Sequence, residues 1–128
     1  MLGIQNKFLK AGVLLKGAEL CSLKDLQTNT EYIWQADPEI WSSHAPNLFP
    51  VIGVLKNGEY KYDGTTYQMP KHGFVRHNKN IKLKDKTATS LLFSLEYSEE
   101  TLTIYPFKFE FDILFSLQGK TLKVSHKI

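Results

Sequence analysis

The sequence predicts an all-β fold, an antiparallel β-sandwich, on three observations. Apolar and polar residues alternate over long stretches, short strand-like segments are separated by turn signals, and no stretch has the period of a long helix. Aromatic residues are plentiful, with eight Phe, six Tyr and two Trp, and such residues favour strands. No linker or repeat divides the 128 residues, so we expect one unit over residues 1–128.

The longest alternating run covers residues 105–117, where every second side chain is apolar. Only Pro106 and Leu114 interrupt the polar positions between them. A period of two residues predicts a long, half-buried strand. Three other segments alternate in the same way and are predicted as strands at residues 122–128, 91–97 and 81–83.

The clearest turn signal is Asp63-Gly64, because Asp-Gly supplies the positive φ angles of a two-residue hairpin turn. The predicted cross-strand pairs are Tyr62 with Thr65 and Tyr60 with Tyr67. Asp37-Pro38-Glu39 predicts a single helical turn. Two further turns are predicted at Gln118-Gly119-Lys120 and at Asp85-Lys86.

The composition argues against several classes of function. A net charge of +3 is small for a nucleic-acid-binding protein, and Asp85 interrupts the lysines between Lys79 and Lys86. The single cysteine, Cys21, allows no internal disulfide and no metal spacing. Neither a signal-peptide layout nor a long apolar run is present. We expect a soluble cytoplasmic protein with no nucleic-acid or membrane partner.

One segment, Met69-Pro70-Lys71-His72-Gly73-Phe74-Val75-Arg76, carries the strongest functional signal. Pro70 and Gly73 flank His72 closely, which predicts a defined, non-helical backbone at the histidine. Arg76 adds a fixed cation with forked hydrogen-bond donors. We expect His72 and Arg76 to face one concave surface that binds a polyhydroxylated or anionic ligand.

The chain resembles the aldose 1-epimerases, or mutarotases, and most closely their LacX-like branch. The resemblance rests on blocks that occur in the family's order and span nearly the whole chain. They are Gly17 to Leu23, Glu31 to Gln35, Asp37 to Trp41, Pro46 to Leu55, His72 to Arg76, and Glu100-Thr101 with Tyr105 to Phe109.

The resemblance implies the galactose mutarotase-like supersandwich, with residues 1–128 as the N-terminal part of the full domain. Mutarotases interconvert the α and β anomers of an aldose by general acid–base ring opening, and this chemistry needs no metal or cofactor. In the family the acid, a His, and the base, a Glu, lie further along the chain, beyond Ile128 here. We therefore expect no catalytic residue in these 128 residues, and no turnover by them alone.

The resemblance also implies substrate-binding residues. His72 would hydrogen-bond a sugar hydroxyl, and Arg76 would reach the sugar or a phosphate on it. Asn47 can donate and accept at once, although Leu48 follows it where many mutarotases carry Arg. Other candidates are expected to be structural, namely Trp34, Trp41 and Phe74 in the core, His44 in a loop and His126 as an inward-facing histidine at a sheet edge.

Two alternatives remain open at the level of sequence. One is a relative of the hexose-6-phosphate mutarotases, and the other is a sugar-binding module without catalysis. Because strands of a missing C-terminal half would cover the apolar face of residues 105–117, we also expect self-association or pairing with that half.

Overall fold

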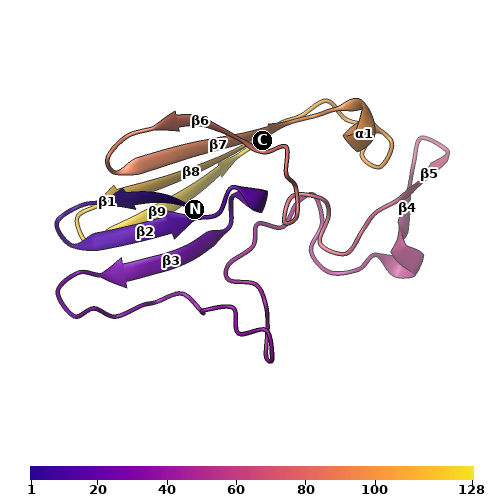
Figure 1. The fold of residues 1–128 in the computed structure, drawn as a ribbon. Coiled ribbons are helices and arrows are strands. Elements are labelled where there is room, and N and C mark those ends of the chain that lie inside the picture. The colour runs from indigo at the N-terminus through magenta and orange to yellow at the C-terminus, as the bar shows by residue number, and fades with distance from the viewer.

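The computed structural model describes residues 1–128 and shows two antiparallel sheets packed face to face (Figure 1). One sheet has the strand order β1-β2-β3 and the other has the order β6-β7-β8-β9. The strands of the first sheet are β1 (Leu2–Gln5), β2 (Leu9–Val13) and β3 (Leu20–Asp25). Those of the second are β6 (Lys82–Lys86), β7 (Ser90–Glu96), β8 (Glu110–Gln118) and β9 (Thr121–Lys127). The antiparallel β-sandwich predicted from the sequence is confirmed.

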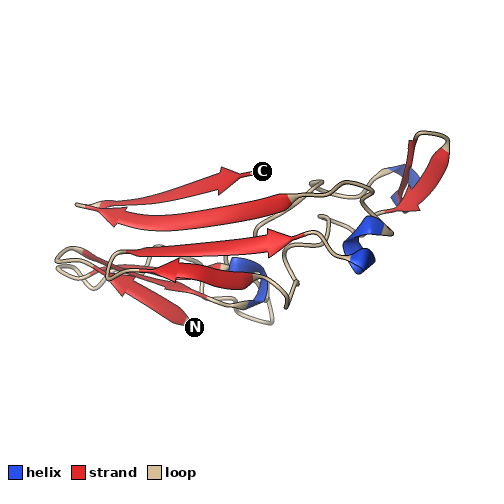
Figure 2. Cartoon of the chain, turned by 90° about the horizontal axis from the view of Figure 1, so that it is seen from above, coloured by secondary structure: helices blue, strands red, loops and turns tan.

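A separate hairpin, β4 (Glu59–Tyr62) with β5 (Thr65–Gln68), lies outside both sheets. Figure 2 shows it projecting at the end of the molecule opposite the turns between the sandwich strands. Asp63 and Gly64 both have positive φ, at 46° and 75°, as a turn of this type requires. The register confirms the two predicted cross-strand pairs, and the stacked rings of Tyr60 and Tyr67 lie 5.4 Å apart.

The core lies between the two sheets and follows from the alternation within β7 and β8. Side chains pointing inward from these strands are almost fully buried, and those pointing outward are polar or partly exposed. The first sheet supplies the opposite wall. The most completely buried side chains are Phe93, Phe115, Leu91, Ile113, Val13 and Val75.

Two predicted strands have different bounds in the structure. The run at 105–117 becomes a strand only from Glu110, because Pro106 has no N–H to donate and the preceding residues form a turn after helix α1 (Glu99–Leu102). The predicted turn at Asp85-Lys86 is wrong, since both residues belong to β6. A register shift between Leu83 and Asp85 breaks the alternation there, so alternation alone does not indicate the second half of the strand.

Helix α1 was also absent from the sequence expectations. It is a single turn held by a capping box, in which the Ser98 side chain accepts from the Thr101 N–H and the Thr101 hydroxyl accepts from the Ser98 N–H. The predicted helical turn at residues 37–39 is present, with the N–H of Trp41 donating to the carbonyl of Asp37 at 2.8 Å. Two short 3-10 segments, η1 (Lys16–Ala18) and η2 (Lys56–Gly58), complete the fold. None of the helical segments has the length and apolar character needed to cross a membrane.

The expectation that the apolar face of residues 105–117 lies uncovered is wrong. Phe111, Ile113, Phe115 and Leu117 are each 5% exposed or less, because the three-stranded sheet of the same chain covers them. Val124 of β9, at the edge of the larger sheet, stays 38% exposed. The reason given above for self-association therefore does not apply to β8.

Candidate functional site

The predicted binding residues lie in the loop-rich part of the chain between β3 and β6. Residues 26–55 contain no strand, and their path turns back on the segment that carries the His-Gly-Phe motif. The two segments join where Phe49 and Gly73 form a parallel bridge and the Phe74 N–H donates to the Phe49 carbonyl at 2.9 Å. Long loops without regular structure are a common location for binding sites.

Gly73 is required by this close approach. Its φ is +74°, and a Cβ at this position would overlap the carbonyl of Phe49 and lie 2.7 Å from the nitrogen of Pro50. Those neighbours are backbone atoms and cannot turn aside as a flexible side chain would. The glycine thus fixes the position of the His72 loop against residues 49 and 50.

His72 is half-buried, and both its backbone and its ring are bound to Gly53. The His72 N–H donates to the carbonyl of Gly53 at 2.8 Å, and the N–H of Gly53 donates to Nδ1 of His72 at 2.9 Å. Because Nδ1 accepts a hydrogen bond, the neutral ring carries its proton on Nε2. His72 also has a positive φ of 66°, an uncommon backbone conformation for a residue other than glycine. The result is an oriented imidazole with one N–H donor free of intramolecular partners.

Arg76 is partly buried and has no acidic partner. One terminal nitrogen donates to the hydroxyl of Ser43 at 3.2 Å, while Nε is buried without a hydrogen-bond partner. The backbone of Arg76 packs against η1, where a Cβ on Gly17 would overlap the Arg76 carbonyl. The guanidinium keeps donor capacity that the protein itself does not use.

Asn47 is held by other parts of the chain. Its Nδ2 donates to the carbonyls of Gly17 at 2.9 Å and Ala18 at 2.8 Å, and its Oδ1 lies 3.1 Å from Nε2 of His126. Both amide protons are used, so the side chain joins η1 to β9. A sugar contact by Asn47 would use the remaining acceptor capacity of Oδ1, and it stays a prediction.

His126 lies on the inner side of β9, as expected, with its ring 5.8 Å from that of Phe111 and nearly parallel to it. The ring is nevertheless exposed, because the sheet ends at β9. His44 is a loop residue, as expected, and its N–H donates to the Glu19 carboxylate at 2.5 Å.

Two cationic side chains, Arg76 and Lys16, and one carboxylate, Glu19, lie around His77. Desolvation lowers the pKa of His77, and the positive charges of Arg76 and Lys16 lower that pKa further, while Glu19 acts in the opposite direction. Glu19 is already bound to the N–H of His44 and lies 3.6 Å from the His44 ring. An anion entering this region would meet two cationic side chains.

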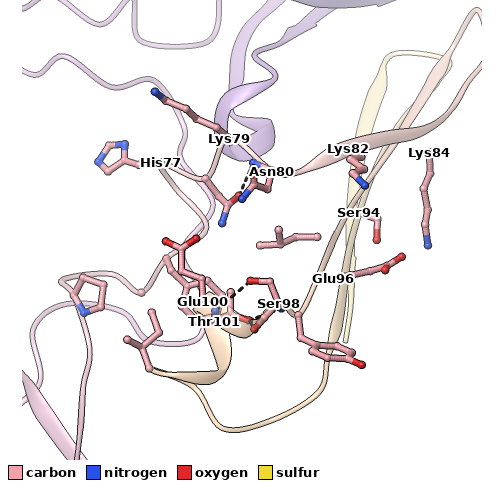
Figure 3. A pocket seen from close by; sticks show the side chains of 17 residues that line it. His77, Lys79, Asn80, Lys82, Lys84, Ser94, Glu96, Ser98, Glu100 and Thr101 are labelled. Carbon is pink, nitrogen blue, oxygen red and sulfur yellow. Dashed lines mark hydrogen bonds between the residues drawn. The ribbon is translucent and has the colours of Figure 1, made fainter.

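A hollow of about 950 Å³ lies between β6, β7 and α1 and reaches the predicted loop only through Pro70, Gly73 and Phe74. Figure 3 shows Lys82, Lys84, Ser94 and Glu96 coming from the two strands, and Ser98, Glu100 and Thr101 from the helix end. His72, Arg76 and Asn47 do not line it. The placement of His72 and Arg76 on one shared concave surface thus stays a prediction.

The aromatic candidates divide into two groups. Phe74 packs with Phe49, Tyr105 and Phe109, which fits the expectation of a core role. Trp34 and Trp41 are 37% and 47% exposed, so the core role predicted for them is wrong. The indole N–H of Trp34 donates to the carbonyl of Trp41 at 2.8 Å, which holds both in one loop.

Sequence reasoning missed the residues that orient the site. Gly53 holds the His72 ring, and Ser43 binds Arg76, but neither stands near its partner in the sequence. The only sequence signal for Gly53 is its place within the block from Pro46 to Leu55.

Comparison with known proteins identifies the family to which this chain belongs. The family model described as aldose 1-epimerase matches residues 1–128. Protein LacX from Lactococcus lactis subsp. lactis, in plasmid and chromosomal forms, is 33% identical over 130 residues, which cover 98% of this chain and 43% of LacX.

Two solved structures have the same fold over almost the whole chain. The galactose mutarotase related enzyme from Lactobacillus acidophilus is 42% identical, with a TM-score of 0.93, and the match covers 98% of this chain and 41% of that protein. A galactose mutarotase-like protein from Lactobacillus casei is 36% identical, with a TM-score of 0.94, over 98% of this chain and 42% of the other. The chain therefore spans less than half the length of these relatives and corresponds to their N-terminal portion. It belongs to the aldose 1-epimerase family.

Proposed function

We propose that this chain supplies the sugar-binding loops of an aldose 1-epimerase-type isomerase, which interconverts the α and β anomers of an aldose. The observation that carries the proposal is the fixed imidazole of His72. Its Nδ1 accepts from the Gly53 N–H, so Nε2–H is an oriented donor on a half-buried loop. A sugar hydroxyl is a suitable acceptor for such a donor.

The chemistry of the proposed reaction separates binding from proton transfer. Ring opening needs a base that removes the proton of the C1 hydroxyl and an acid that protonates the ring oxygen. We assign neither role to His72, and expect both groups in the part of the relatives that this chain does not match. His72 would orient the reacting end of the sugar, and Arg76 would contribute further donors.

Sugar titration of the 128-residue polypeptide tests this proposal. We expect galactose or glucose to perturb the NMR signals of the His72 ring and of the backbone amides of Gly53 and Phe74, and His72→Ala to abolish the perturbation of those two amides. His77→Ala is the matched control, because His77 is exposed and makes no side-chain hydrogen bond. Loss of sugar binding in both variants, or in neither, contradicts the assignment.

Polarimetry with fresh α-D-glucose and α-D-galactose tests the catalytic part. We expect no mutarotation above background from the 128-residue polypeptide, because the acid–base contribution of about 10²- to 10⁴-fold is missing. A rate that scales with protein concentration and disappears in His72→Ala would contradict this expectation.

A phosphorylated aldose is the second candidate ligand, and the state of Arg76 favours it. The guanidinium has no carboxylate partner and Nε is buried without a hydrogen bond, although Arg is the residue that binds phosphate in a bidentate way. If the substrate carries a phosphate, glucose 6-phosphate should bind about tenfold more tightly than glucose. Arg76→Gln should remove that difference, whereas equal affinities for the two sugars would favour the free sugar.

A further inference from the structure

The loop that follows β3 is fixed by its own chain although it contains no strand. It runs back along β3, where isolated bridges join Lys24 to Glu31 and Leu20 to Ala45 (Figure 1). The segment between these bridges, residues 32–44, is therefore anchored on the first sheet at both of its ends. An anchored loop presents its exposed side chains in defined positions, and this lowers the ordering cost of binding a ligand.

Polar contacts, and not the core, hold the two tryptophans of this loop. The backbone N–H of Trp41 donates to the carbonyl of Asp37, and the indole N–H of Trp34 donates to the carbonyl of Trp41, both at 2.8 Å. Trp41 itself is 47% exposed, and its own indole N–H makes no hydrogen bond within the chain. Trp41 thus offers a flat apolar face with an unused donor at its edge.

The same loop brings Trp41 close to the unused donors of Arg76. Ser43, two residues after Trp41, accepts a hydrogen bond from the Arg76 guanidinium at 3.2 Å. Two residues of chain span at most about 7 Å, so the indole and the guanidinium belong to one small region of the structure. Nε of Arg76 is buried there without a partner. An aromatic face beside a few polar donors is the usual composition of a small-molecule site.

We propose that Trp41 is the aromatic platform of the ligand site and packs against the apolar C–H face of the aldose whose rim Arg76 binds. The inference rests on the proposed function and adds a specificity-determining residue to it. A pyranose ring carries hydroxyl groups around its rim and C–H groups on its faces. An indole face can therefore bury one face of the ring while the guanidinium donates to rim oxygens or to a phosphate. A second copy of this chain fits less well, because an apolar contact between copies would leave the Arg76 donors unused.

NMR titration with galactose and glucose tests the platform. We expect either sugar to shift the indole signals of Trp41 and to give intermolecular NOEs between the indole and the sugar C–H protons. Trp41→Ala should weaken the affinity, measured at the amides of Gly53 and Phe74, by at least about fivefold. Trp41→Phe keeps an aromatic face and should recover part of the loss. Ile40→Ala is the matched control, because Ile40 is an apolar neighbour in the same loop, 74% exposed and without a ring.

The outcomes separate this inference from the proposed function. Sugar shifts at Gly53 and Phe74 without NOEs to Trp41, or with equal affinity in Trp41→Ala, would overturn the platform and leave the role of His72 intact. Shifts and NOEs at Trp41 without shifts at those two amides would support the platform and contradict the role of His72. Indole signals that change on dilution and not with sugar would mean that a second copy covers the ring, and no response at any of these groups would overturn both proposals.

Discussion

The sandwich and the loop region between β3 and β6 hold their shapes in different ways. Of the seventeen residues in the hydrophobic core, only Phe49, Val75 and Ile81 come from residues 26–81. The loops depend instead on backbone contacts without space for a side chain, as at Gly73, and on side chains bound to backbone groups, as at Asn47 and His72. Packing stabilises the scaffold, and directed polar contacts position the candidate binding residues.

This difference predicts which changes unfold the protein and which alter the site. Apolar truncation in the sheets should cost the most free energy, because burial is complete there. Polar changes in the loops should cost less and should affect ligand binding more. The four predictions below test that order, from the largest expected effect to the smallest.

Phe93→Ala should lower the free energy of unfolding by about 3–5 kcal/mol, because the ring is fully buried between the sheets and meets Phe115 edge-on. Phe107→Ala is the comparison from outside the sheets, where the ring is half-buried beside Tyr62 and Tyr105. Urea denaturation should give a clearly smaller loss for Phe107→Ala. Equal losses would mean that the loop end is packed as tightly as the sandwich.

Gly73→Ala should lower the free energy of unfolding by about 2–5 kcal/mol, because the left-handed backbone costs about 1–2 and the overlap with Phe49 about 1–3. Gly64→Ala has nearly the same φ, +75°, but its Cβ would meet nothing within 4 Å. The control variant Gly64→Ala should therefore lose only the part of the unfolding free energy that comes from the left-handed backbone. Similar losses in the two variants would show that the approach of the two loops is not tight in solution.

Strands β7, β8 and β9 were predictable from the sequence because each of them repeats a local rule, whereas no alternation pattern predicted β1 or β2. The alternation in β7, β8 and β9 is visible residue by residue, and Asp63-Gly64 gives the β4–β5 register directly. Alternation no longer marks the strand where the rule is broken locally, by Pro106 before β8 and by the register shift in β6. The covering of β8 by the first sheet depends on contacts between distant segments, which no alternation pattern contains.

Asn47→Ala should cost about 1–3 kcal/mol, because it leaves the carbonyls of Gly17 and Ala18 without their shared donor. Asn47→Asp should cost more, since a carboxylate oxygen would then face those two carbonyls. Sugar affinity measured on the same variants separates the two roles of Asn47. Full stability with lost affinity would contradict the structural role and support direct contact with the sugar.

The site was predictable only in part, for a related physical reason. The motif around His72 predicted a defined, non-helical backbone at this residue. In the structure His72 has a φ of +66°. The group that orients its ring, the N–H of Gly53, lies 19 positions away and is an ordinary backbone amide. Asn47 looked like a free amide in the sequence, yet three groups from η1 and β9 occupy it. Side-chain types suggest what a site can bind, whereas their intramolecular partners decide which atoms remain available.

Glu31→Gln should give the smallest effect, and one that depends on pH. Burial raises the pKa of Glu31, but the hydroxyl of Ser22 and the N–H groups of Ile33 and Leu23 donate to the carboxylate and bring the pKa below its ordinary value of 4.5. The charged form is favoured by folding, so its contribution is present above pH 4.5 and is lost as the pH falls through the lower, folded-state pKa. The difference in unfolding free energy between the native chain and Glu31→Gln should therefore narrow below pH 4.5. Glu39→Gln is the control, because its carboxylate accepts no hydrogen bond. Urea titrations at several pH values between about 3 and 7 measure the difference, and a gap of constant size would mean that this loop is not held by the carboxylate.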